Sequence, residues 1–274
     1  MAEEPLGRRA TIELLERHGV TPAKRLGQHF LVDPNTTRKI VAVAGVEPGT
    51  RVLEIGAGAG TLTRALAAAG ATVIAYEVDD RLAPVLETAL AGLASVEVRF
   101  EDATTAGLAS VATGTPWMLV ANLPYNVGTP LVLDLLRTAP AIGRFVVMLQ
   151  REAVDRLVAL PGSRTYGLPS VVVGLHGSPA VRMRVPPSVF HPPPQVESAV
   201  VVIDRAPAPA RAERAIGLAA AGFGQRRKML RSALAGVLGE PVAVLERAGV
   251  DPTARAEGVS PQDWLRVAEV ADAL

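Results

Sequence analysis

Short apolar runs alternate with amphipathic stretches along most of the chain. The clearest runs cover residues 51–55, 71–76, 96–100, 117–121 and 145–149. Each run is short and is followed by Gly or a polar residue, which predicts a buried strand, whereas 61–67 has the pattern of a helix. Residues 170–175 and 200–203 predict two further strands. Strands that alternate with helices to about residue 204 predict an α/β fold, with a parallel sheet covered on both faces.

The pattern changes after residue 205. Residues 206–210 read Ala-Pro-Ala-Pro-Ala, which cannot continue a strand and is typical of a short, stiff linker. Beyond it, the sequence predicts helices over 211–223, 228–238, 242–248 and 261–273, the last with Ser260 as its N-cap. We therefore predict two domains, 1–205 and 206–274, the second small and helical.

A glycine-rich loop and three polar side chains follow four successive predicted strands. Gly56-Ala57-Gly58-Ala59-Gly60 follows the first strand, and Glu77, Asp102 and Asn122 come at the ends of the next three. Glycines let the backbone approach a ligand closely, and the following helix presents free N–H groups. Glu77 lies 21 residues after Gly56, where a ribose-binding carboxylate is expected. The series predicts a nucleotide-cofactor site, with Asp102 able to reach an adenine amine.

Residues 122–125, Asn-Leu-Pro-Tyr, suit methyl transfer to the exocyclic amine of a planar base. The side-chain oxygen of Asn122 and a backbone carbonyl beside Pro124 can accept the two N–H groups of the amine. Proline turns the chain without adding a donor that needs a partner. Tyr125 offers a flat face on which a flipped-out base can stack. An isolated motif of this kind is also compatible with a simple strand and turn.

Several narrower motifs resemble the ribosomal RNA adenine N6-dimethyltransferase family, of the KsgA type that acts on small-subunit RNA. The resemblance extends along nearly the whole chain, and the matching segments are residues 26–33, 54–60, 122–125, 189–200 and 223–230. It implies a Rossmann-like methyltransferase fold, S-adenosylmethionine as cofactor and two adjacent adenines near the 3′ end of 16S RNA in the 30S subunit as substrate.

The resemblance also assigns roles to residues. It implies cofactor contacts from His29, Leu31, Gly56, Gly58, Glu77, Asp102 and Asn122. It implies a pocket for the target base made by Asn122, Leu123, Pro124 and Tyr125, with Phe190 closing over the second face of the base. The proline-rich segment 190–194 would present Phe190 on a rigid loop. The C-terminal helical domain would hold the RNA.

Charge distribution supports an RNA partner although the net charge is only +1. Arg226, Arg227, Lys228 and Arg231 form a cluster with no acidic residue between Gly217 and Gly239. A local excess of cations supplies the phosphate contacts that dominate sequence-independent affinity. Four arginines between 156 and 196 form a second acid-free stretch.

Composition excludes other classes of protein. There is no cysteine, so neither a disulfide framework nor a thiolate metal site is expected, and the four histidines show no ligand spacing. The N-terminus lacks the apolar core of a secretory signal, and no apolar run is long enough to span a membrane. These features predict a cytoplasmic protein without a bound metal, and the family resemblance implies a monomer.

Three alternatives remain open from the sequence. The Erm type methylates an adenine in large-subunit RNA and confers macrolide resistance, but its motif commonly has isoleucine where Leu123 stands. A non-catalytic ribosome-assembly factor is disfavoured by the intact series of Gly56, Glu77, Asp102 and Asn122. An NAD-dependent enzyme is disfavoured because Thr61 replaces the last glycine of the dinucleotide-binding pattern.

Overall fold

A computed structural model describes residues 4–23, 26–114 and 116–273, and these fold into two compact units. The first unit comprises Met1–Val154 and Ala180–Asp204, and the second comprises Asp155–Pro179 and Arg205–Leu274. The break at 204/205 coincides with the predicted boundary to within one residue. Residues 155–179, which we assigned to the first domain, belong instead to the second unit.

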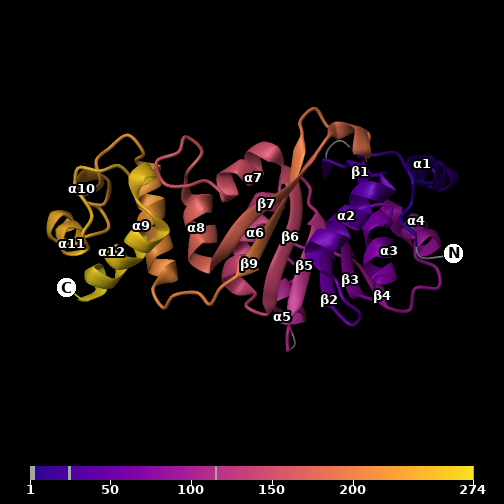
Figure 1. The fold of residues 1–274 in the computed structure, drawn as a ribbon, viewed down its shortest axis with the longest axis horizontal. Coiled ribbons are helices and arrows are strands. Elements are labelled where there is room, and N and C mark those ends of the chain that lie inside the picture. Colours follow the sequence, from indigo (N-terminus) through magenta and orange to yellow (C-terminus); the bar gives the residue numbers. More distant parts are fainter. Residues whose placement is uncertain (1–3, 24–25, 115, 274) are drawn as a thin grey trace. The chain divides into compact units, whose positions relative to one another are not determined.

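The described part of the first unit is built on a seven-stranded sheet with the order β4-β3-β2-β5-β6-β9-β7 (Figure 1). Its strands are β2 (Arg51–Ile55), β3 (Thr72–Glu77), β4 (Val96–Phe100), β5 (Trp117–Asn122), β6 (Ile142–Gln150), β7 (Gly177–Val185) and β9 (Ser198–Arg205). Neighbours from β4 to β6 are parallel, as predicted, whereas β9 pairs antiparallel with β6. The α/β fold is confirmed, with this antiparallel pair as a departure from an all-parallel sheet.

Helices cover both faces of the central strands. Consecutive residues of β5, β6 and β9 are buried, and since their side chains alternate between faces, neither face is open to solvent. Within the described ranges, the helices of this unit include α1 (Arg8–Arg17), α2 (Pro34–Ala44), α3 (Thr61–Ala68), η2 (Asp80–Leu82), α4 (Ala83–Ala89), α5 (Leu108–Val111), α6 (Gly128–Thr138) and η3 (Pro187–Val189). The helix α7 (Arg151–Leu157) contains the residues at which the chain first leaves this unit.

A separate two-stranded ribbon joins distant segments of the first unit. Its strands, β1 (Phe30–Leu31) and β8 (Phe190–His191), are antiparallel, with Leu31 opposite Phe190. This pairing holds the segment before α2 beside the proline-rich segment that precedes β9.

The second unit is helical. It contains α8 (Leu168–His176), α9 (Ala212–Gly224), α10 (Leu230–Ala233), α11 (Pro241–Arg247), η4 (Ala256–Gly258) and α12 (Pro261–Ala273). Helices α8, α9 and α12 pack on one another, closely enough that a Cβ on Gly222 would lie 2.8 Å from the Trp264 ring. No helix among the residues described here has the length and apolar character needed to cross a membrane.

Two predictions for this unit were wrong. Residues 170–175 form part of helix α8 and not a strand, because Pro169 occupies its first turn and its apolar side chains are buried within the helical unit. The helix predicted over 228–238 is much shorter in the structure, where only α10 forms. Arg226, Arg227 and Lys228 therefore lie in the turn that precedes α10.

Candidate functional site

The glycine-rich loop connects β2 to α3 in a conformation that needs glycine. Gly56 and Gly58 have φ of 80° and 57°. The N–H groups of Gly56 and Ala57 both donate to the carbonyl of Tyr76, at 2.8 and 3.1 Å, which ties the loop to β3. A Cβ on Gly58 would lie 3.1 Å from the Phe30 ring, tighter than an ordinary contact. The loop therefore leaves its backbone open to close approach by a ligand.

Glu77, at the end of β3, is held by backbone N–H groups. Its Oε2 accepts from Gly58 at 2.8 Å, and its Oε1 accepts from Val78 and Asp79 at 3.0 Å each. Burial raises the pKa of this carboxyl, while the three N–H donors oppose the shift. A carboxylate offers about four acceptor positions, so the bonds leave capacity for a hydroxyl donor such as a ribose 2′-OH.

Asp102 follows β4 at the same edge of the sheet. It is exposed, and its Oδ1 accepts from the backbone and the hydroxyl of Thr104 at 2.9 and 2.7 Å. These bonds to Thr104 lower the pKa of Asp102, so the carboxylate stays ionised and can accept from an adenine amine.

Asn122 ends β5, and its side chain is oriented by the N-terminal segment. Its Nδ2 donates to the backbone carbonyl of His29 at 3.3 Å, which leaves the side-chain oxygen as the acceptor end. The carbonyl of Pro124 accepts from the N–H of Gly128 at 2.9 Å. The Leu123 carbonyl, on the other side of the proline, is therefore the acceptor that we associate with the motif.

Tyr125 is fixed at both ends. Its hydroxyl lies 2.7 Å from the hydroxyl of Ser198, and its ring centroid lies 5.6 Å from that of His29. Burial raises the pKa of the Tyr125 phenol, so this group stays neutral and supplies a flat apolar surface.

The structure brings most of the predicted residues around one cavity that opens to solvent. The predicted residues that line it are His29, Leu31, Gly56, Gly58, Glu77, Asp102, Asn122, Leu123, Pro124 and Tyr125. Elements far apart in sequence meet there because the carboxyl ends of parallel strands share one edge of the sheet.

Phe190 is not among these lining residues. Its side chain is fully buried in the apolar core, and its backbone pairs with Leu31 in the ribbon. The predicted clamp over the second face of the base is therefore not present in this structure, because the ring fills the core under the ribbon. The proline-rich segment reaches the site through its backbone instead, where Nδ1 of His29 donates to the carbonyl of Pro192 at 2.8 Å.

The sequence-based prediction missed one residue that lines the cavity. This residue, Glu54, lies in the matching segment 54–60 but was given no role of its own. It is 1% exposed, and its Oε2 has no hydrogen-bond partner among the described residues. Burial raises the pKa of Glu54 to about 8, and the nearby Glu77 carboxylate acts in the same direction. A single acid inside an otherwise apolar strand run was the available signal.

The cavity fits S-adenosylmethionine. The glycine loop would let the cofactor approach its backbone closely. Glu77 would accept a hydrogen bond from the ribose, and Asp102 would accept one from the adenine amine. Oε2 of Glu54 has no partner among the described residues, and a nearby cation such as the ammonium of the cofactor would favour the ionised form of this carboxyl.

The predicted RNA-binding residues lie in the second unit and are exposed. Nε of Arg226 donates to Glu257 at 2.9 Å, and its Nη2 donates to the carbonyl of Arg164 at 3.2 Å. Arg227, Lys228 and Arg231 extend the basic surface along the turn and the start of α10.

Comparison with known proteins gives the family of this chain. The sequence profile of a family described as ribosomal RNA adenine dimethylase matches residues 21–273. Proteins named ribosomal RNA small subunit methyltransferase A are similar to the chain. The one from Phenylobacterium zucineum is 45% identical over 260 residues, covering 94% of this chain and 90% of its own length. The one from Kineococcus radiotolerans is also 45% identical, covering 96% and 90%.

Solved structures show the same fold. A dimethyladenosine transferase from Plasmodium falciparum superposes with a TM-score of 0.73 at 25% identity, covering 87% of this chain and 96% of its own. The 23S rRNA methyltransferase ErmE superposes with a TM-score of 0.69 at 30% identity, covering 89% of this chain and 99% of its own. The glycine loop, the strand-end acids and the Asn-Leu-Pro-Tyr turn thus occur in a chain that belongs to the ribosomal RNA adenine dimethylase family, with S-adenosylmethionine as methyl donor.

Proposed function

We propose that this protein transfers methyl groups from S-adenosylmethionine to the N6 amine of adenines in small-subunit ribosomal RNA. We further propose that the substrate is the 30S particle, in which two adjacent adenines near the 3′ end of 16S RNA are dimethylated during ribosome biogenesis. One observation carries the proposal: Glu77 and Asp102, the acids suited to a nucleotide cofactor, line the same cavity as Asn122–Tyr125, the turn suited to a flipped base.

Asn122 and Leu123 orient the target amine. The side-chain oxygen of Asn122, fixed by the bond from Nδ2 to His29, accepts one N–H, and the Leu123 carbonyl accepts the other. These two bonds hold the nitrogen lone pair out of conjugation with the ring and aim it into the cavity. When bound, S-adenosylmethionine supplies a methyl group on a sulfonium, which is already strongly electrophilic, so positioning is the main task of the protein.

Tyr125 holds the plane of the base. One face of an adenine stacks on its ring, which is fixed by Ser198 and His29. Burial raises the pKa of the Tyr125 phenol, so the phenol stays protonated and cannot accept the proton of the amine. The amine becomes acidic only as it gains the methyl group, and water takes the proton.

The two units have different roles in this proposal. The first unit carries the catalytic cavity, and the second unit binds RNA through Arg226, Arg227, Lys228 and Arg231, whose exposed side chains suit phosphate contacts. We expect the enzyme to act as a monomer in the cytoplasm, where ribosomal particles are assembled.

The large-subunit alternative is less well supported. ErmE resembles the chain at 30% identity, whereas the relatives named small subunit methyltransferase A reach 45%. Leu123 in the motif, where the Erm type commonly has isoleucine, favours the same choice.

The test uses purified protein, methyl-labelled S-adenosylmethionine, and separate 30S and 50S particles that lack their native modifications. Label recovered as N6,N6-dimethyladenosine in the 3′ end of 16S RNA is the expected result. Label in 23S RNA alone would assign the protein to the resistance type. RNA binding without any label would contradict an enzymatic role.

A further inference from the structure

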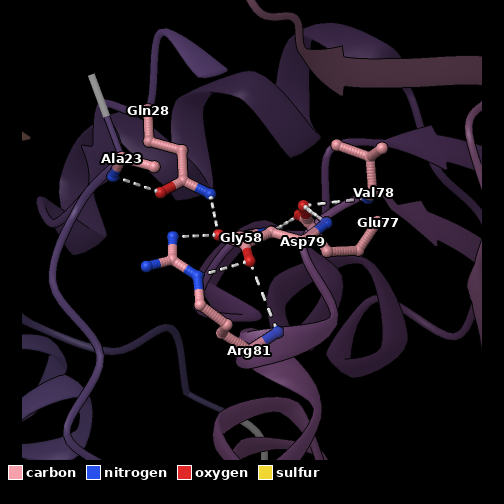
Figure 2. A network of polar contacts seen from close by, with 7 residues as sticks. All are labelled: Ala23, Gln28, Gly58, Glu77, Val78, Asp79 and Arg81. Atoms are coloured by element: carbon pink, nitrogen blue, oxygen red, sulfur yellow. Dashed lines mark hydrogen bonds and ion pairs between the residues drawn. The ribbon is translucent and has the colours of Figure 1, made fainter. Parts of the chain in front are cut away.

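The segment Leu26–Leu31 lines the cavity, yet it lies in the chain well before the sheet begins. Within it, the side chain of Gln28 makes two bonds with different partners (Figure 2). The Oε1 of Gln28 accepts from the N–H of Ala23 at 2.7 Å, and its Nε2 donates to Oδ2 of Asp79 at 2.8 Å, 51 residues along the chain.

Asp79 is a fixed partner for this bond. Its side chain is buried and also accepts from Arg81, with Nε to Oδ1 at 2.8 Å and Nη2 to Oδ2 at 2.6 Å. The bonds from Arg81 lower the pKa of Asp79 to about 2, so its carboxylate is ionised at neutral and mildly acidic pH. Gln28 therefore donates to a permanent anion, which makes this one of the stronger classes of hydrogen bond.

The same residue also holds the ribose-binding acid. The backbone N–H of Asp79 donates to Oε1 of Glu77 at 3.0 Å, while its side chain accepts from Gln28 (Figure 2). Asp79 thus joins the segment over the cavity to the carboxylate at the end of β3.

The chemistry of the link explains why an amide stands at position 28. The Ala23 N–H needs an acceptor and the Asp79 carboxylate needs a donor, and an amide supplies one of each. A carboxylate would oppose the Asp79 charge, and an amine or guanidinium would offer Ala23 no acceptor. Glutamate has nearly the same shape as glutamine, so Gln28→Glu changes the chemistry of the link while keeping its size.

We propose that Gln28 and Asp79 are positioning residues, which hold the segment Leu26–Leu31 over the S-adenosylmethionine cavity and thereby set how long the cofactor stays bound. The proposal rests on the cofactor assignment above but not on the identity of the RNA substrate. Neither residue touches the reacting atoms. Their loss raises the dissociation rate of the cofactor and leaves kcat at saturating cofactor nearly unchanged.

The test compares wild type, Gln28→Glu and Gln28→Ala. Dissociation constants for S-adenosylmethionine and its demethylated product are measured by isothermal titration from about pH 8 to about pH 5, which brackets a glutamate pKa raised by a neighbouring anion. Dissociation rates are measured by stopped-flow, and unfolding midpoints without ligand establish that each variant is folded.

We expect Gln28→Glu to weaken cofactor binding about tenfold or more at the upper end of this range, because a bond to a charged group is replaced by repulsion. As pH falls, the introduced carboxyl becomes protonated and its O–H donates to Asp79, so the ratio of variant to wild-type dissociation constants falls towards one. For Gln28→Ala the ratio stays raised and is independent of pH. Using ratios removes the pH dependence that Glu54 and Glu77 give to every variant.

Gln262→Glu is the matched control, since Gln262 is exposed on α12 and the change adds the same charge. It should leave cofactor binding as in wild type. A ratio near one at all pH values for Gln28→Glu, or a lowered unfolding midpoint with an unchanged dissociation constant, would overturn the positioning role while leaving the proposed methyl transfer intact. A wild-type protein that binds no S-adenosylmethionine would overturn the cofactor assignment and this proposal together.

Discussion

The side-chain amide of Asn122 donates to the backbone carbonyl of His29, 93 residues before it, at 3.3 Å. The bond joins the turn that we associate with the target base to the segment that covers the cofactor cavity. It also distinguishes the two ends of the amide, because the donor end is engaged and the acceptor end is left for substrate.

Replacing Asn122 with alanine should lower kcat by about a hundredfold or more, because the reacting amine loses one of the two acceptors that orient it. The dissociation constant for S-adenosylmethionine should change much less than kcat, since Gly56, Gly58 and Glu77 remain and the bond from Gln28 to Asp79 still holds the segment that contains His29. Methyl transfer to 30S particles and isothermal titration measure the two effects. Asn35→Ala, at an exposed position of α2, is the control, and near-normal turnover of Asn122→Ala would contradict the assignment.

Replacing Glu77 with alanine should act on the other side of the cavity. Loss of the ribose acceptor should raise the cofactor dissociation constant about tenfold to a hundredfold, as expected for a hydrogen bond to a charged group. Turnover at saturating cofactor should fall much less. Isothermal titration tests the first effect, and an unchanged constant would remove Glu77 from the ribose site.

Glu54 should make stability without cofactor depend on pH. Its pKa is raised from an ordinary value of 4.5 to about 8 in the folded protein, so the folded state binds the proton more tightly than the unfolded state. The stability that the folded state gains from this tighter proton binding is therefore fully present below about pH 4.5 and is lost as pH rises through about 8. Glu54→Gln keeps the neutral shape at every pH.

Urea unfolding of wild type and Glu54→Gln at several pH values between these limits measures the effect. The free energy of unfolding of wild type should fall relative to that of the variant as pH rises. Two pH profiles that run parallel would show that Glu54 titrates normally in the folded protein.

Gly58→Ala should disturb the cofactor loop in two ways. Its φ of 57° costs an L-residue about 1–2 kcal/mol, and the new Cβ would lie 3.1 Å from the Phe30 ring. Gly92→Ala is the matched control, because Gly92 has φ of 81° but no atom within 4 Å of the place that a Cβ would take. Both variants should lose stability in urea unfolding, but only Gly58→Ala should also lose cofactor affinity. Equal affinity of the two variants would contradict close approach of the cofactor at Gly58.

Arg227→Ala and Lys228→Ala should weaken RNA binding without affecting the cofactor. Each exposed cation that contacts a phosphate should lower the slope of log K against log salt by about one. Filter binding to 16S RNA fragments over a range of salt concentrations measures the slope. Arg247→Ala, exposed in α11 outside the cluster, should keep the wild-type slope, and identical slopes for all variants would remove the cluster from the interface.

Sequence patterns located the site because its residues follow directly from strand ends. Gly56, Glu77, Asp102 and Asn122 each come where an apolar run stops, and parallel pairing from β4 to β6 brings those ends to one edge. The family resemblance supplied the cofactor, which spacing alone did not separate from NAD.

Local pattern failed where burial by distant residues decides conformation. Residues 170–175 are apolar and β-branched enough for a strand, but they pack on α9 and α12 as a helix, since a short apolar run satisfies either structure. The proline-rich sequence predicted that Phe190 would be presented to the target base, but β8 pairs with β1 and the ring of Phe190 is buried in the core.

The sequence by itself determined the order of strands and helices over most of the chain, the polar residues at the strand ends and the family. These depend on hydrophobic periodicity and on motifs that are local in the chain. Only the tertiary structure decided that Gln28 binds Asp79, that Glu54 keeps an unpartnered oxygen at the cavity among the described residues, and that Phe190 is buried. The physical reason is that hydrogen-bond partners, desolvation and pKa depend on which distant segments share a space, and no spacing within one segment encodes that.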